Sequence, residues 1–217
     1  MGEDLTLDFI EFHYLKIFTG VISVLNPLGV VPVFLGLTSA RDPAERKSIA
    51  RTTAFSTALI LMLAAISGQA ILDFFGISIS SFRMGGGILI LLMAISMLHA
   101  KTSHAKHTPD EAKEAEDMDS IAVVPLAIPM LAGPGAISAV IVYAHEVKNI
   151  QEIAVLGGVI LLSGIIVWSV LRLAVPIGTK LGKTGINIIV RIMGLLLAAI
   201  AVEFMATGLK GLFPSLG

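Results

Sequence analysis

The sequence predicts an all-α membrane protein whose six transmembrane helices form two inverted repeats of three helices each. Its composition, its apolar runs and a likeness between its two halves predict this fold class. Apolar residues make up 55% of the 217 residues and charged residues only 14%, with a mean hydropathy of +0.90, whereas roughly a quarter of the residues in soluble domains are charged. A soluble fold of this size could not bury so much apolar surface.

Six apolar segments are each close to or above the roughly 20 residues that a helix needs to cross the hydrocarbon core. Their approximate limits are residues 10–37, 49–72, 81–99, 120–144, 152–175 and 188–212. Between the third and the fourth, residues 101–119 carry three lysines and six acidic residues and no apolar run, which predicts a solvated linker. We therefore divide the chain into an N-terminal repeat (1–100), a charged linker (101–119) and a C-terminal repeat (120–217).

The first and the fourth segments are interrupted by proline and glycine at matching positions. The spacing from Pro27 to Pro134 is nearly the same as the spacing from Arg83 to Arg191, which begin a second pair of similar segments. Two pairs in the same order indicate an internal repeat, a plan that many secondary transporters share. Because each repeat crosses the bilayer three times, the second begins on the opposite side, so the repeats must be inverted.

The interruptions predict that helices 1 and 4 are discontinuous, at residues 26–32 and 125–135. Proline inside a helix removes a hydrogen-bond donor and clashes with the preceding turn, and glycine costs about 1 kcal/mol relative to alanine. Unwound backbone at membrane depth is tolerated only where protein buries it or water reaches it, so both breaks should face the protein interior. A lone kink is usually architecture, but paired breaks indicate a substrate site, where helix N-termini suit an anion and free carbonyls suit a cation.

Basic residues are concentrated in the loops that follow the first, third and fifth helices. These loops contain Arg41, Arg46, Lys47, Arg51, Lys101, Lys106, Lys113, Arg172, Lys180 and Lys183. Short loops rich in lysine and arginine stay in the cytoplasm. We therefore expect a multi-pass protein of the cytoplasmic membrane, with the linker inside the cell and both termini outside.

Several classes of function lack their usual residues. The chain has no cysteine, which excludes disulfides and thiol chemistry, and its net charge of -1 gives no basic surface for nucleic acid. The acidic N-terminus predicts that no signal peptide is cleaved. No phosphate-binding loop, Ser/His/Asp set or HExxH zinc motif occurs. We therefore expect neither an enzyme nor a cofactor or metal site.

The two broken segments resemble the signatures of a known family. Residues 26–34 (NPLGVVPVF), running on to Thr38, resemble the first-helix signature of the MarC family of integral membrane proteins, and residues 125–138 (PLAIPMLAGPGAIS) resemble its fourth-helix signature. Arg83 with the glycines after it, and residues 191–202, extend the match over essentially the whole chain. The resemblance implies a six-span inner-membrane protein related to archaeal transporters of small neutral amino acids, such as glycine and alanine, coupled to a cation or a proton.

By the same resemblance, the residues around the substrate are those of the paired signatures. They are Asn26, Pro27, Gly29, Gly133, Pro134, Gly135 and Ser138. The side chain of Asn26 has two compatible roles open to it, contact with the substrate or capping of the following half-helix. Ser138 could bond back to a carbonyl of the preceding turn, as serines within helices often do.

Glu203 lies near the middle of the sixth segment, between apolar neighbours. An ionisable group at the centre of a membrane helix costs roughly 2.5 to 3.5 kcal/mol on insertion scales, which makes it a functional candidate. Two roles are open, ion coupling and an interhelical hydrogen bond, and replacement by glutamine separates them. Arg83 and Arg191, near the starts of the third and sixth helices, are expected to reach headgroups or loop carbonyls, with gating as the weaker alternative.

The sequence therefore predicts a secondary transporter that moves small neutral amino acids by alternating access, with H+ or Na+ as the coupling ion. One alternative is an ion or small-solute channel, which would need a pore lined by repeated polar rings. Another is an exporter of drugs or other metabolites. The lipid bilayer is the surrounding partner in each case, and homo-oligomerisation is left open.

Overall fold

The computed structural model describes residues 2–99, 121–147 and 149–216, and in these residues the chain is helical with no strand. The elements are α1 (Gly2–Leu25), α2 (Pro27–Leu37), α3 (Pro43–Phe74), α4 (Ile79–Leu98), η1 (Ala122–Leu131), α7 (Pro134–Glu146), α8 (Ile150–Arg172), α9 (Ala174–Leu212) and η2 (Pro214–Leu216). Within these described ranges, five helical spans are long and apolar enough to cross a membrane, or six if the bent pair η1 and α7 counts as one. The predicted all-helical membrane fold is confirmed, and the predicted linker (101–119) lies outside the described residues.

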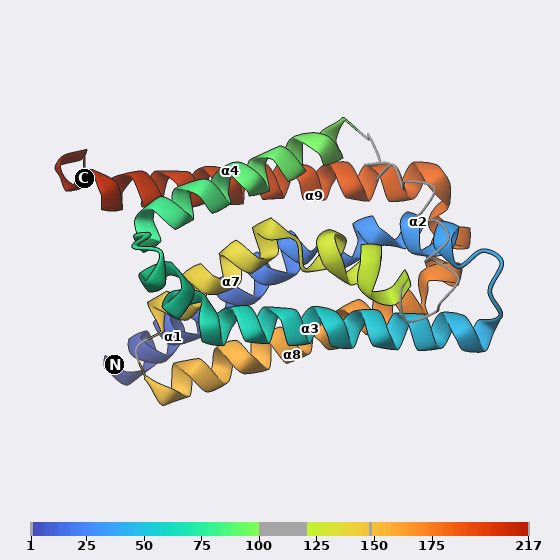
Figure 1. Ribbon diagram of the computed structural model, residues 1–217, viewed down its shortest axis with the longest axis horizontal. Coiled ribbons are helices and arrows are strands. Elements are labelled where there is room, and N and C mark those ends of the chain that lie inside the picture. The colour runs from blue at the N-terminus through green and yellow to red at the C-terminus, as the bar shows by residue number, and fades with distance from the viewer. Residues whose placement is uncertain (1, 100–120, 148, 217) are drawn as a thin grey trace.

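The helices form three layers along a common direction (Figure 1). α4 packs mainly against α9 on one side, and α3 packs against α8 on the other. The interrupted helices α1–α2 and η1–α7 lie between these two pairs and contact both of them. Both breaks therefore lie inside the protein, as predicted, and both ends of the chain lie at the same end of the bundle (Figure 1).

Local sequence signals fix where the helices begin. α3 starts with a capping box, in which the Asp42 carboxylate accepts hydrogen bonds from the first turn and the Glu45 carboxylate accepts one from the Asp42 N–H at 3.2 Å. Ser78 caps α4, and Asn149 caps α8. Each cap satisfies backbone N–H groups that have no partner within the helix.

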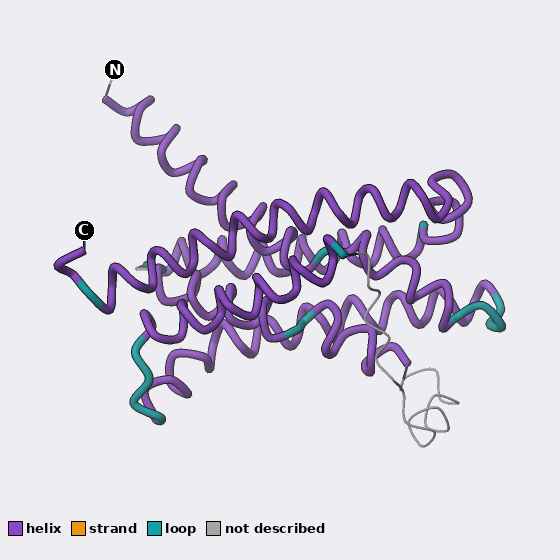
Figure 2. Tube along the Cα trace, turned by 90° about the horizontal axis from the view of Figure 1, so that it is seen from above, coloured by secondary structure: helices purple, strands orange, loops and turns teal. Residues whose placement is uncertain are grey.

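The last long helix begins earlier than the sequence predicted. α9 starts at Ala174, turns at Gly182, whose φ of +59° favours glycine, and then continues as the span Thr184–Leu212. The prediction placed the start at residue 188 because the preceding segment is polar and basic. At the other end of the chain, the first turns of α1 project away from the bundle (Figure 2).

Candidate transport site at the broken helices

The first break is a local unwinding at Asn26. Asn26 has left-handed backbone angles (φ 45°, ψ 61°), is only 6% exposed, and accepts a hydrogen bond on Oδ1 from the Gly29 N–H at 3.2 Å. Pro27 occupies the first position of α2, where a missing N–H costs nothing. The capping role predicted for Asn26 is therefore confirmed. The span from Tyr14 to Leu37 continues across this break.

Gly29 is required by this cap. A β-carbon at Gly29 would collide with the Nδ2 atom of Asn26. The signature therefore pairs an asparagine that closes the turn with a glycine that leaves room for its amide.

The second break is a true bend. η1 and α7 meet at an angle of 62°. Within η1, Val124 and Ile128 have extended backbone, and the peptide bonds that follow them, before Pro125 and Pro129, are cis. α7 then starts after Gly133 with no side-chain cap. A β-carbon on Gly133 would collide with the carbonyl oxygen of Pro129, so the bend needs glycine there.

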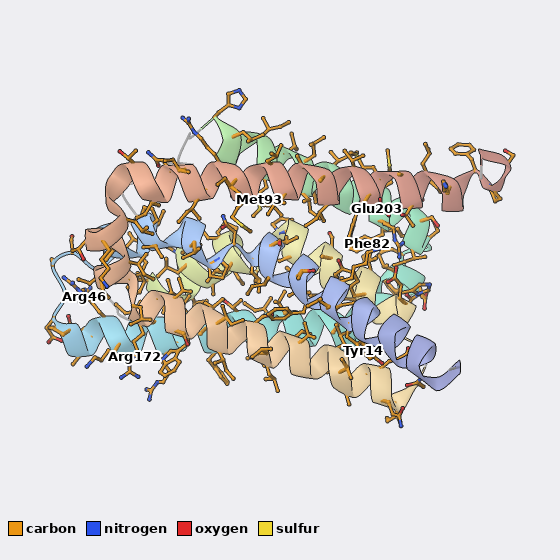
Figure 3. All side chains as sticks on the ribbon, turned by 180° about the vertical axis from the view of Figure 1, so that it is seen from behind. Tyr14, Arg46, Phe82, Met93, Arg172 and Glu203 are labelled. Carbon is orange, nitrogen blue, oxygen red and sulfur yellow. The ribbon has the colours of Figure 1, made fainter. Side chains whose placement is uncertain are left out.

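A cavity of about 260 Å³ opens at the first break. Its walls come from α1, α2, the end of α4, η1 and the start of the α9 span, and Figure 3 shows Met93 between the layers. The lining residues are Leu25, Asn26, Gly29, Val30, Pro32, Val33, Met93, Ser96, Met97, Pro129, Met130, Asn187 and Val190. The cavity is mainly apolar, with a few polar side chains.

The cavity contains two of the seven predicted site residues, Asn26 and Gly29. Pro27 is buried at the start of α2 but does not line it. The other four, Gly133, Pro134, Gly135 and Ser138, belong to the second break and are absent from its lining. Gly135 approaches Ile90 and Val24, and Ser138 packs on Gly86. The structure forms no hydrogen bond from Ser138 to a carbonyl among the described residues.

The amide of Asn26 is the most distinctive polar group in the cavity. Among the described residues, its Nδ2 atom has one hydrogen-bond acceptor, the Sδ atom of Met97 at 3.5 Å, and a thioether is a weak acceptor. The Ser96 hydroxyl, by contrast, already donates to the Leu92 carbonyl at 3.0 Å. A buried amide donor without a strong acceptor is expensive unless a ligand or water completes it. The cavity can therefore offer a hydrogen bond to a carboxylate or carbonyl.

A second cavity, of about 170 Å³, lies at the end of the bundle where the chain begins and ends. It is lined by Lys16, Ile17, Arg83, Val142, Tyr143, Glu146, Glu203, Phe204 and Thr207. Two cations and two carboxylates therefore share one small space. We call it the charged cavity.

The charged cavity corrects the expected surroundings of two predicted residues. The Nη2 atom of Arg83 pairs with Oε1 of Glu146 and ties α4 to the end of α7, and Arg83 forms no hydrogen bond to a loop carbonyl among the described residues. Glu203 is not enclosed by apolar neighbours, because its side chain is exposed and lines the charged cavity. Figure 3 shows it far along α9, away from Arg46 and Arg172 at the other end.

The MarC family integral membrane protein model matches residues 12–213. The chain is 43% identical to UPF0056 membrane protein YhcE of Escherichia coli K12, over 96% of this chain and 97% of the relative. It is 40% identical to UPF0056 membrane protein YvbG of Bacillus subtilis, over 92% and 95%, and 38% identical to a UPF0056 membrane protein of Methanocaldococcus jannaschii, over 97% and 92%. No solved structure matches. The chain therefore belongs to the MarC family of integral membrane proteins.

Proposed function

We propose that this MarC family member is a secondary transporter that moves small neutral amino acids, such as glycine and alanine, across the cytoplasmic membrane. The observation that carries the proposal is the cavity at the first break, where the Asn26 amide nitrogen has a weak thioether acceptor, Met97 Sδ. A volume of about 260 Å³ is just below the usual size of small-molecule sites, roughly 300–1,000 Å³. Apolar walls around a few polar groups suit a small amino acid whose carboxylate meets the amide.

Reciprocal packing between α4 and α9 supports the inverted repeat that alternating access requires. A β-carbon on Gly87 would lie 3.0 Å from the Ala201 carbonyl oxygen, and one on Gly194 would lie 3.1 Å from the Ala94 carbonyl oxygen. Gly194 follows Gly87, and Ala201 follows Ala94, at the same spacing that separates the two broken signatures. A contact that repeats with its partners exchanged is the mark of a two-fold relation.

The same spacing relates the two cavities to each other. It carries Ser96 and Met97 of the first cavity onto Glu203 and Phe204 of the charged cavity. It also carries Arg83 of the charged cavity onto Val190 of the first cavity, which directly precedes Arg191, the counterpart of Arg83 in the sequence. Three lining positions of each cavity therefore correspond under the proposed repeat.

Alternating access follows from this arrangement if the repeats rock about the breaks. The two cavities share no lining residue, which favours a transporter over a continuous channel. We assign the pair Arg83 and Glu146 as the closed gate on the side of the termini, which the basic loops place outside the cell. Glu203, which lines the same cavity, is the proposed coupling carboxylate, because it can exchange a proton or Na+ beside that gate.

The proposal is tested by amino acid counterflow in proteoliposomes. Asn26→Ala is expected to lower uptake of glycine and alanine at least tenfold, because the buried amide that lacks a strong acceptor is lost from the cavity. Asn149→Ala is the matched control, since Asn149 caps α8 with a bond from the Glu152 N–H at 2.9 Å, far from the cavity. Both variants lose about 1 kcal/mol of cap stability. Equal uptake by the two variants, or linear flux that no amino acid saturates, would contradict the proposal.

The gate and the coupling residue are tested separately. The natural chain has no cysteine, so Ser96→Cys and Thr207→Cys each place a single thiol in one cavity. The rate at which a membrane-impermeant reagent labels each thiol is measured with and without saturating substrate. Substrate should raise the labelling rate of one thiol and lower that of the other. A change in the same direction for both would contradict alternating access. Glu203→Gln should retain counterflow but lose its response to a proton or sodium gradient. An unchanged response would remove Glu203 from coupling.

A further inference from the structure

A groove of about 250 Å³ runs along the outer face of α3 and α8, apart from both cavities. α3 contributes Arg51, Ala54, Phe55 and Ala58, and α8 contributes Leu161, Gly164, Ile165 and Trp168. Small residues form its floor, since a β-carbon on Gly164 would lie 3.1 Å from the Ala58 β-carbon and 3.6 Å from the Ala54 carbonyl oxygen. The side chains of Phe55, Leu161 and Ile165 are more than half exposed beside it. The groove therefore offers an apolar channel that is open to the bilayer.

One end of the groove is cationic. α3 and α8 run in opposite directions, which places Arg51 beside Trp168, and the Arg172 guanidinium lies 5.1 Å from the centre of the Trp168 ring. Figure 3 shows Arg172 at the same end of the bundle as Arg46. Arg51 and Arg172 form no ion pair with an acidic residue in the part of the chain that the structure describes. Two guanidinium groups without a counter-ion thus border one end of an apolar groove.

We propose that this groove is a binding site for an anionic phospholipid. One acyl chain lies along Ala54, Ala58 and Gly164, and the phosphate is held by Arg51 and Arg172. Arginine forms paired, charge-assisted hydrogen bonds with phosphate oxygens, and basic pockets between transmembrane helices are a known form of headgroup recognition. Tryptophan prefers the interface between headgroups and acyl chains, which sets the depth of the site. The apolar groove and the charged end each match one part of this ligand.

Trp168 provides the measurement, because it is the only tryptophan in the chain. The full chain is reconstituted in vesicles that mix phosphatidylcholine with phosphatidylglycerol, with bromine on the acyl chains of only one lipid at a time. Bromine quenches tryptophan emission on contact, so the two experiments report which lipid occupies the groove. Each basic residue near the surface raises affinity for an anionic lipid roughly fivefold, so two arginines should give a preference for phosphatidylglycerol of about 25-fold.

Each variant is assessed by the ratio of its tryptophan emission in brominated lipid to its emission in unbrominated lipid. Both intensities come from the same variant, so any direct effect of Arg172 on Trp168 emission cancels. Arg51→Gln and Arg172→Gln should each reduce the preference to about fivefold, and the double variant should abolish it. Arg191→Gln is the matched control, since Arg191 is an exposed arginine of α9, and it should change nothing. Circular dichroism and thermal unfolding of each variant confirm that the fold is retained.

Three results would overturn the proposal. Equal quenching by both brominated lipids would show that the groove is filled by bulk lipid without any preference for the anionic one. No quenching by either would show that protein, such as a second copy, covers the groove. Relief of quenching by free glycerol phosphate at millimolar concentration would assign the arginines to a soluble phosphate instead of a membrane lipid.

Discussion

The close packing of α4 against α9, which we call the close seam, predicts that alanine substitutions at neighbouring glycines differ sharply in their effect on stability. A β-carbon on Gly87 would lie 2.6 Å from Met205 Cγ and 3.0 Å from two backbone atoms, the Ala201 oxygen and the Met205 nitrogen. Backbone atoms cannot move aside as a flexible side chain can, so the two helices must separate. Gly85, two residues earlier, is exposed, and a β-carbon placed on it would have no neighbour within 4 Å.

The magnitude follows from these two environments. Both substitutions by alanine gain about 1 kcal/mol of helix propensity, whereas overpacking costs Gly87→Ala about 1 to 3 kcal/mol. The variant Gly87→Ala should therefore be less stable than Gly85→Ala by about 2 kcal/mol, which corresponds to roughly 4 to 8 °C in Tm for a chain of this size. Gly194→Ala should resemble Gly87→Ala, since its β-carbon would lie 3.0 Å from Met97 Cβ.

Thermal unfolding of the purified protein in detergent measures the difference, with all variants in the same micelle. Similar Tm values for Gly85→Ala and Gly87→Ala would refute the close seam. A large decrease in Tm for Gly87→Ala with no decrease for Gly194→Ala would refute the reciprocal packing, and with it the support for an inverted repeat.

Two further predictions concern single polar contacts. Gly29→Ala should lower the free energy of unfolding by about 1 to 2 kcal/mol, because its β-carbon displaces the capping amide of Asn26. In an Asn26→Ala background the same change should cost nothing, and an additive cost in this double-mutant cycle would contradict a shared cause. Ser163 is fully buried, and its hydroxyl has no hydrogen-bond partner among the described residues, so Ser163→Ala should stabilise the protein by about 1 kcal/mol in the same unfolding assay. A loss of stability instead would indicate a water or ligand bound to that hydroxyl.

The features that the sequence predicts well are those that depend on nearby residues. Proline and glycine disrupt the helical turn in which they stand. The break at Asn26 and the break before Pro134 can therefore both be predicted from the local sequence. The cap of α2 is equally local, since Asn26 and Gly29 are three residues apart. Hydrophobic runs fix the spans for the same reason, because each must cross the bilayer alone.

The cavity could not be predicted in this way. Met93, Ser96 and Asn187 line it, yet each has an ordinary sequence context, and only the packing of α4 and α9 brings them to the first break. The same holds for the pair of Arg83 and Glu146, whose members are 63 residues apart. A matching offset could have suggested part of the answer, because Ser96 and Glu203 keep the spacing of the two broken signatures.

The chemical difference between equivalent positions bears on how transport would be coupled. A symmetric carrier for a neutral solute would need the same groups in both repeats, but Glu203 stands at the position equivalent to Ser96. Charged residues are costly in a membrane protein and are retained where function uses them. On the transport proposal, the Asn26 cavity then supplies recognition of the substrate, and the charged cavity supplies exchange of the coupling ion. The ion would therefore bind and leave through the side of the termini, while the neutral cavity on the opposite side releases substrate without moving a charge of its own.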